Sequence, residues 1–281
     1  MIGKILITGS KGYIGSHLIE KLTAIQKYEV VGFDRGDDLD SLIKGCDIVY
    51  HLASNVSLTE KVEWCDIEND LRLTLYLLEK CIENDVGSII YASSGGTVYG
   101  PARGPIKEDH TTAPISPYGM LKLTIENYIK FYCDLYNFNY LILRISNPYG
   151  GNTKKGLIYH ILKAIKTGTL FTLWGDGSHV RDFIYIDDLI KAMELLGLNC
   201  LQGIFNISTG KGVSINKLIE IIQIMSKKEL KIINKPRRLI DNFYNVLDNT
   251  KLIHSVNWSP QIDLIKGIEL WGKIDENSLC S

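Results

Sequence analysis

The stretch Lys4-Ile5-Leu6-Ile7-Thr8-Gly9-Ser10-Lys11-Gly12-Tyr13-Ile14-Gly15 decides the fold of this chain. Its apolar start predicts a strand, and the helical pattern that follows it runs to about Ile25. Between them, Gly9 permits a tight turn, Gly12 lets the backbone approach a pyrophosphate, and Gly15 lets the helix pack on the strand. The helix N-terminus offers N–H groups and a positive dipole end to an anion. We therefore expect a dinucleotide-binding turn; the alternative is an ordinary glycine-rich strand–helix turn.

An acidic residue, Asp34, ends the next predicted strand, where the dinucleotide fingerprint places one. Its carboxylate should accept hydrogen bonds from the adenosine ribose. At about 4 Å it would repel a 2′-phosphate by roughly 4 kcal/mol per unit charge at an effective dielectric near 20, which favours NAD over NADP. Arg35 follows directly and could accept a 2′-phosphate, so this choice stays open. Asp37 is placed either to meet the adenine amino group or in a solvated acidic loop.

Short β-branched runs alternate with amphipathic ones through the first half of the chain. Strands are expected at 4–8, 29–34, 48–53, 88–93 and 140–146, with helices beginning near Tyr13, Glu60 and Ser116. The strands are apolar almost throughout, as in a sheet covered by helices on both faces. The sequence therefore predicts an α/β fold with a Rossmann-type, doubly wound parallel sheet.

The regular alternation breaks after Gly150. A helix at 157–166 and strands at 170–174, 183–186 and 204–207 are expected there, the last returning to the first sheet. We divide the chain into a dinucleotide-binding domain, 1–150, to which the chain returns at about 183–208. A second, smaller α/β substrate domain takes residues 151–182 and 209–281.

Composition favours a small-molecule partner. With 31 basic and 32 acidic residues the net charge is −1, so no overall field recruits nucleic acid or an anionic membrane. The six cysteines show no CxxC or other metal-ligand spacing and are expected to be reduced, with no metal bound. Without a signal-peptide pattern or an apolar run of membrane-spanning length, a cytoplasmic location is expected.

A tyrosine and a lysine, Tyr118 and Lys122, share one face of the helix expected from Ser116, because they are four residues apart. A tyrosine has a pKa of about 10, and lowering it by three units takes about 4 kcal/mol of phenolate stabilisation. A nearby ammonium in a partly desolvated site supplies energy of that order, and a positive nicotinamide ring adds to it. This pair is our candidate for taking a proton from a sugar hydroxyl.

Taken together, the motifs resemble the extended short-chain dehydrogenase/reductase family, and within it look most like UDP-galactose (UDP-glucose) 4-epimerases. The resemblance covers nearly the whole chain. Besides the glycine turn and Tyr118 with Lys122, it rests on DIVYHLA at 47–53, SSGGTVYG at 93–100, RISNP at 144–148, GDG at 175–177, RDF at 181–183, and PRR at 236–238 followed by Asp241.

The resemblance implies NAD as cofactor, a UDP-sugar or other nucleotide-sugar as substrate, and a homodimer formed through a two-helix face. It places beside the cofactor the turn residues Tyr13 and Ile14 and the residues Leu52, Ala53 and Ser54. It also implies that the nucleotide-sugar meets Asn147, Gly156, Leu157, Arg181 and Arg238. The two arginines would grip the pyrophosphate, a role that suits the guanidinium fork.

The chain departs from the family at Gly95, where relatives usually carry a catalytic hydroxyl. Ser94, Thr97 or a bound water could replace it. Thr97 is the preferred candidate, because a strand-end serine one residue away should point to the other face. Sugar dehydratases and decarboxylases of this fold place acids where this chain has Gly96 and Thr97, so 4-epimerisation of a UDP-hexose is the expected reaction.

Two other functions remain open. A 4-keto-sugar reductase or other dehydrogenase could use the same residues, and a catalytically silent dinucleotide-binding protein is the less favoured reading. His51 and Arg144 lie in the quoted motifs, but a buried strand histidine and an ion-pair partner are the ordinary roles of such residues. Neither is assigned to catalysis.

Overall fold

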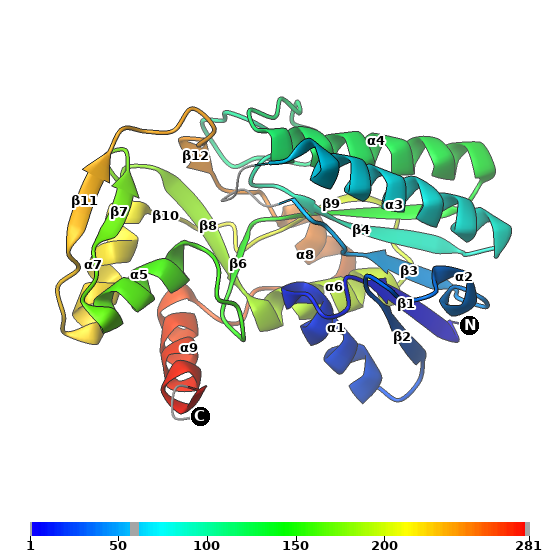
Figure 1. Ribbon diagram of the computed structural model, residues 1–281, viewed down its shortest axis with the longest axis horizontal. Helices are drawn as coiled ribbons and strands as arrows, with labels where there is room; N and C mark the ends of the chain where they lie inside the picture. The colour runs from blue at the N-terminus through cyan, green and yellow to red at the C-terminus, as the bar shows by residue number, and fades with distance from the viewer. Residues whose placement is uncertain (1, 57–61, 279–281) are drawn as a thin grey trace.

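The computed structural model describes residues 2–56 and 62–278. Its main sheet has the strand order β2-β1-β3-β4-β5-β9 within that part of the chain (Figure 1). All of its neighbouring strands run parallel. The strands are β1 (Lys4–Thr8), β2 (Glu29–Phe33), β3 (Ile48–His51), β4 (Ser88–Ser94), β5 (Asn139–Ile145) and β9 (Gly203–Ile207).

Helices cover both faces of this sheet, which explains its nearly unbroken apolar strands. On one face α1 (Tyr13–Ala24) packs with α6 (Ile186–Leu198), and on the other α3 (Trp64–Glu83) packs with α4 (Pro117–Tyr136). A short helix, α2 (Leu39–Leu42), leads from β2 toward β3. The predicted doubly wound α/β fold is confirmed.

Helix α4, which carries the tyrosine and the lysine, begins where the sequence predicts. The hydroxyl of Ser116 accepts a hydrogen bond from the backbone N–H of Gly119 at 3.1 Å, and Pro117 occupies the first turn. Helix α3 begins at Trp64; the expected start near Glu60 lies outside the described residues.

A smaller unit packs against the carboxyl-terminal edge of the main sheet (Figure 1). One of its sheets has the order β10-β8-β12, with β6 also paired to β8, and the other pairs β11 with β7. Its strands are β6 (Asn147–Tyr149), β7 (Phe171–Trp174), β8 (Val180–Tyr185), β10 (Gly212–Ser214), β11 (Ile232–Lys235) and β12 (Tyr244–Asn245). Its helices are α5 (Leu157–Thr167), α7 (Ile215–Ser226), α8 (Thr250–Val256) and α9 (Leu264–Ser278).

The strand expected at 183–186 corresponds to β8. It begins earlier, at Val180, and ends at Tyr185, because Ile186 already begins α6. The chain passes from β8 in the smaller unit through α6 to β9, which pairs with β5 in the main sheet. The domain limits proposed from the sequence stay a prediction.

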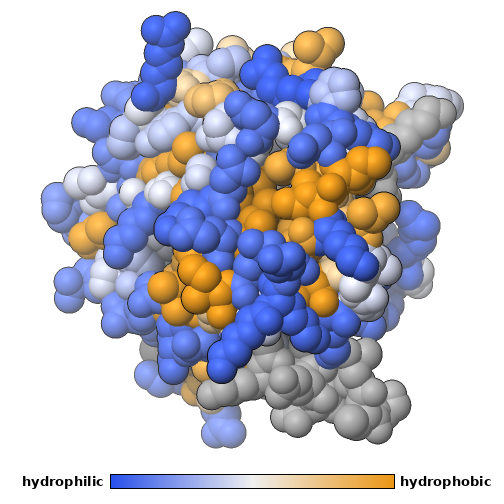
Figure 2. Space-filling view, turned by 90° about the vertical axis from the view of Figure 1, so that its left-hand side faces the viewer, coloured by the Kyte–Doolittle hydropathy of each residue, from blue (hydrophilic) through white to orange (hydrophobic). Residues whose placement is uncertain are grey.

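The outer face of the smaller unit carries apolar side chains between polar ones (Figure 2). Leu170, Ile232, Ile233 and Leu239 are among its exposed large hydrophobic residues. None of the described helices is both long and apolar enough to cross a membrane.

Strand β1 pairs with β2 on one side and with β3 on the other, so the chain order reverses at β1. In sheets of this kind, ligands bind outside the carboxyl ends of the strands at such a switch point. The glycine turn follows β1 directly, and Ser94 ends β4 at the same edge. This edge faces the smaller unit.

Candidate active site

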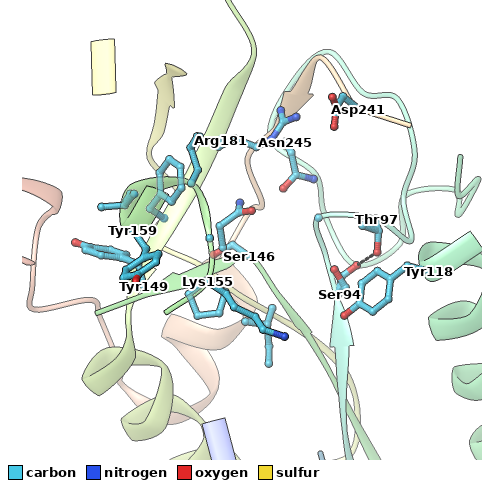
Figure 3. A pocket seen from close by; sticks show the side chains of 18 of the residues that line it. Ser94, Thr97, Tyr118, Ser146, Tyr149, Lys155, Tyr159, Arg181, Asp241 and Asn245 are labelled. Atoms are coloured by element: carbon cyan, nitrogen blue, oxygen red, sulfur yellow. Dashed lines mark hydrogen bonds between the residues drawn. The ribbon is translucent and has the colours of Figure 1, made fainter. Parts of the chain in front are cut away.

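A cavity of about 530 Å³ lies between the carboxyl edge of the main sheet and the smaller unit. It brings together residues that are far apart in the sequence, from both parts of the molecule (Figure 3). Of the predicted site residues, it is lined by Ile14, Leu52, Ser54, Ser94, Thr97, Tyr118, Lys122, Asn147, Gly156, Leu157, Arg181 and Arg238. Gly9, Gly12, Tyr13, Gly15, Asp34, Asp37 and Ala53 are not part of its lining.

The glycine turn has the geometry that a dinucleotide pyrophosphate requires. Gly9 has a φ of +69°, and a Cβ there would lie 2.8 Å from the backbone nitrogen of Ala53. A Cβ on Gly15 would lie 2.1 Å from the carbonyl oxygen of Gly9. Gly12 occupies the N-cap of α1 and provides no capping side chain, so the first N–H groups face outward to an anion. These residues fit NAD.

Asp34 is held against this turn. Its carboxylate accepts hydrogen bonds from the hydroxyl of Ser10 and, at 2.9 Å, from the backbone N–H of Lys11. Asp37 accepts a hydrogen bond from the backbone N–H of Asp34 at 2.8 Å, so its carboxylate stabilises the loop. Arg35 donates to the side-chain oxygen of Asn55 at 2.9 Å and is thereby directed toward the β3–α3 connection.

Tyr13 is directed away from the cavity. Its hydroxyl donates to the carbonyl oxygen of Gly150 at 3.0 Å. The side chain therefore ties α1 to the start of the smaller unit, and only the backbone of Tyr13 lies in the glycine turn. A contact between Tyr13 and the cofactor stays a prediction.

Lys122 is a buried ammonium behind Tyr118. Its Nζ donates to the carbonyl oxygen of Ala92 at 3.1 Å and lies 4.9 Å from the ring centre of Tyr91 and 5.6 Å from that of Tyr118. Burial lowers the pKa of Lys122 to about 8, against the opposing charges of Asp70 and Glu126. Burial thus makes this lysine easier to deprotonate than a lysine in water.

Burial opposes ionisation of Tyr118 in the protein without its cofactor. Burial, together with the charge of Asp70, raises its pKa to about 12, while the nearby Ser94 side chain acts in the opposite direction. Desolvation is the largest of these influences. Ionisation of this phenol at neutral pH needs a further positive charge, which the nicotinamide ring of bound NAD⁺ carries.

The hydroxyl beside Tyr118 belongs to Ser94. Ser94 lines the cavity and its side chain lies beside the phenol, so the expectation that it points to the other face is wrong (Figure 3). Thr97 also lines the cavity, but its hydroxyl donates at 3.4 Å to the carbonyl oxygen of Ser94.

Gly95 leaves no hole in the cavity wall. A Cβ at this position would lie 2.3 Å from Cδ1 of Leu247 and 3.2 Å from the carbonyl oxygen of Arg144. Leu247 is fully buried and packs with Val98 and Tyr99. The direction in which a side chain at position 95 would point is thus filled by an apolar side chain.

The smaller unit contributes polar side chains to the opposite wall. Asn147 donates to the carbonyl oxygen of Asp182 at 2.8 Å. Arg238 forms a two-pronged ion pair with Asp241, with both N–O distances at 2.8 Å. Arg181 is largely buried, and its pKa is lowered by burial despite the charge of Asp241. This wall is the positively charged end of the cavity.

Sequence reasoning missed part of the lining. Ser146, Tyr149, Lys155, Trp174, His179 and Asn245 also face the cavity. Ser146 and Tyr149 border the predicted Asn147, so that motif could have indicated them. The others are brought in by segments whose approach to the main sheet leaves no local pattern in the sequence.

His51 and Arg144 have the structural roles expected of them. His51 is buried between the hydroxyls of Thr8 and Thr74, each at 2.9 Å, and burial lowers its pKa to about 3. Arg144 pairs with the buried Glu126, with N–O distances of 2.7 and 3.1 Å. Both interpretations are confirmed.

Comparisons with known proteins agree with this site. Residues 5–208 match the NAD dependent epimerase/dehydratase family. A protein of Methanocaldococcus jannaschii, provisionally named UDP-glucose 4-epimerase, is 36% identical over 94% of this chain and 96% of the relative. The dTDP-4-dehydro-6-deoxyglucose reductase of Escherichia coli is 32% identical over 94% of this chain and 95% of its own.

A solved structure shows the same architecture with ligands bound. UDP-glucuronic acid 4-epimerase from Bacillus cereus, in complex with UDP-glucuronic acid and NAD, superposes with a TM-score of 0.92. It is 27% identical, and the likeness covers 98% of this chain and 99% of that one. With the fold, the glycine turn and the sequence match in agreement, the chain belongs to the NAD dependent epimerase/dehydratase family.

Proposed function

We propose that this protein is an NAD-dependent UDP-hexose 4-epimerase. The observation that carries the proposal is the single cavity in which Tyr118 and Ser94 face the arginines Arg181 and Arg238. A nucleotide-sugar has a diphosphate at one end and the reacting ring at the other. The cavity offers guanidinium groups for the first and an acid–base pair for the second.

Bound NAD⁺ would accept the hydride of ring carbon 4 and return it to the opposite face of that carbon, which inverts its configuration. Tyr118 takes the proton of the sugar hydroxyl, and Ser94 orients that hydroxyl and stabilises the phenolate. Lys122 keeps a positive charge behind the phenol. We assign the orienting role to Ser94 in place of Thr97, because the Ser94 side chain lies beside the Tyr118 phenol while the Thr97 hydroxyl donates to the carbonyl oxygen of Ser94 (Figure 3).

The nucleotide-sugar is held mainly by the smaller unit. Arg181 and Arg238 bind the diphosphate oxygens, and Asn147, with the α5 N-terminus at Gly156 and Leu157, contacts the sugar nucleotide. The glycine turn would hold the cofactor's pyrophosphate, and Asp34, whose carboxylate lies against that turn, would accept hydrogen bonds from its adenosine ribose. The bond from Arg35 to Asn55 supports the preference for NAD, because it turns the guanidinium toward another partner.

A second candidate function is a 4-keto-sugar reductase that uses the same residues. It is considered because the E. coli relative is a reductase. Relatives with UDP-sugar 4-epimerase names match most of the chain, which favours the epimerase. Gly96 and Thr97 stand where dehydratases of this fold carry acids, which argues against a dehydratase. Tyr118 and Lys122 in the same cavity as arginines suited to a diphosphate argue against a silent dinucleotide-binding protein.

We also propose a homodimer formed through the outer face of α3 and α4. This two-helix face exposes several large apolar side chains. Monomeric proteins rarely expose large apolar patches to water, and such patches often mark interfaces. The exposed side chains are Trp64 and Tyr76 on α3 and Met120, Tyr128, Phe131, Leu135 and Tyr136 on α4.

Proton NMR of UDP-glucose, incubated with the protein and substoichiometric NAD, tests the proposed reaction. The expected result is the appearance of UDP-galactose until the two sugars reach equilibrium. A requirement for stoichiometric reduced cofactor, with a 4-keto sugar as the only substrate, would establish the reductase instead. UDP-glucuronic acid and the N-acetylated UDP-hexoses, assayed alongside, identify the preferred sugar.

A further inference from the structure

Two buried asparagines of the smaller unit hold the turn that follows β4. The side-chain nitrogen of Asn245 donates to the carbonyl oxygen of Gly95 at 3.0 Å, and that of Asn242 donates to the carbonyl oxygen of Gly96 at 3.1 Å. Asn245 is 1% exposed and Asn242 is 6% exposed. Consecutive carbonyl groups directly after Ser94 are therefore fastened to a segment about 150 positions later in the chain.

The segment that carries these asparagines also carries the arginine end of the cavity. Asn242 directly follows Asp241, the ion-pair partner of Arg238. In the parallel pairing of β12 with β8, Asn245 lies opposite Arg181. The two arginines predicted to bind the diphosphate are thus connected to the turn after Ser94 by a few covalent bonds and one strand pairing.

The orientation of both carboxamides is dictated by their partners. Each faces a backbone carbonyl oxygen, which only an NH₂ group can satisfy. As a result, the Oδ1 atoms of Asn242 and Asn245 are buried and have no hydrogen-bond partner among the described residues. Buried polar atoms are nearly always paired, whereas here two side-chain oxygens stay unpaired while the side-chain nitrogens fix one turn.

A neighbouring asparagine shows an ordinary structural role. Asn249 lies in the same segment, is also buried, and donates its side-chain nitrogen to the carbonyl oxygen of Ser208 at 2.9 Å. It does not line the cavity, and its oxygen is not among the unpaired atoms. Asn245, in contrast, faces the cavity between Arg181 and Thr97 (Figure 3).

We propose that Asn242 and Asn245 are positioning residues that hold residues 94–97 in the conformation in which the Ser94 hydroxyl meets Tyr118. The inference rests on the proposed epimerase function and extends it. Both asparagines act through Ser94, whereas the arginines beside them act on the substrate. Removing either carboxamide frees the turn and impairs proton transfer without weakening the diphosphate grip.

A double-mutant cycle tests this mechanism. Asn245→Leu and Asn242→Leu, which keep the approximate size but lose the donor, should each lower kcat by about tenfold. This is less than the roughly hundredfold or more expected for losing an acid–base group itself, because the asparagines act only through Ser94. UDP affinity, measured by calorimetry, should change less than twofold. In a Ser94→Ala background the same substitutions should change kcat less than twofold, because the residue through which they act is gone.

Asn249→Leu is the matched control, expected to lower thermal stability but not kcat. An equal loss of kcat in both Ser94 backgrounds would overturn the proposal, as would unchanged kcat in both asparagine variants or an equal loss in the control. If one asparagine variant fails to fold, the other carries the test.

A second readout does not depend on turnover. The ¹³C chemical shift of the Tyr118 phenol carbon, assigned with Tyr118→Phe, should move in the same direction in Asn245→Leu as in Ser94→Ala. If the wild type does not interconvert UDP-hexoses, the proposed function fails while this shift still tests the positioning role. An unmoved shift in Asn245→Leu, alongside a moved one in Ser94→Ala, would contradict it.

Discussion

The side chain of Ser94 lies beside the phenol of Tyr118 in the cavity, although the residues lie on different elements, β4 and α4 (Figure 3). Ser94→Ala should therefore lower kcat by roughly ten- to a thousandfold, the scale of one positioned hydrogen bond in acid–base catalysis. Nucleotide-sugar affinity should barely change. Thr97→Val is the control and should cost less than threefold in kcat. Steady-state kinetics of both variants test this assignment. An unchanged kcat in Ser94→Ala together with an inactive Thr97→Val would assign the role to Thr97 instead.

Gly95→Ala should destabilise the protein by about 1 to 3 kcal/mol, the usual cost of overpacking. The added Cβ would approach Cδ1 of Leu247 to 2.3 Å, and Leu247 is fully buried. Gly96→Ala is the control, because the nearest atom to its Cβ, Oγ of Ser94, lies 3.6 Å away. Urea unfolding measures both. Equal stability of the two variants would show that Leu247 does not restrict position 95.

Lys122→Met should abolish turnover yet raise stability at pH 7 by about 1 to 3 kcal/mol. The folded-state pKa of Lys122, about 8, lies below its ordinary value of 10.5, so the folded protein disfavours the ammonium form. This penalty is complete below pH 8 and fades as the pH rises toward 10.5. Denaturant unfolding at pH 7 and pH 10 should show the advantage of Lys122→Met shrinking.

Lys130→Met, on the same helix, is the control for the loss of a lysine that does not line the cavity. A Lys122→Met variant less stable than the wild type at pH 7 would mean that the bond to the carbonyl of Ala92 outweighs the burial penalty.

Phe131→Glu should convert a dimer into a monomer. Phe131 is 61% exposed on α4, and a carboxylate placed there would be buried without a partner against a second copy. Sedimentation measurements would show the halved mass. Ile224→Glu is the matched control, because Ile224 is 68% exposed on α7 in the smaller unit. A wild-type protein that is already monomeric, or a dimer that survives Phe131→Glu, excludes this face.

Features set by local spacing could be predicted from the sequence. The glycine turn lies within one strand–helix unit, and Tyr118 and Lys122 are one helical turn apart, so their relative placement follows from chain geometry alone. The sheet follows for the same reason, since each apolar strand needs cover on both faces. His51 and Arg144 were predictable because buried polar groups on strands need partners.

Features set by distant contacts could not be predicted. The choice between Ser94 and Thr97 depends on how residues 94–97 turn, and Asn242, Asn245 and Leu247 determine that turn from far along the chain. The burial of Tyr118 is a further example. Spacing reveals the nearby ammonium, but the desolvation that raises the pKa of the phenol exists only in the folded protein.

In the proposed reaction, ring carbon 4 is transiently oxidised and the same hydride is returned to it. This reaction is tested most directly with UDP-glucose deuterated at carbon 4, incubated with the protein and unlabelled NAD and followed by mass spectrometry. The expected product is UDP-galactose that retains the deuterium, with no net change in the amount of reduced cofactor. Tyr118→Phe should form no product. Deuterium found in the free cofactor pool, or product formed by Tyr118→Phe at the wild-type rate, would contradict it.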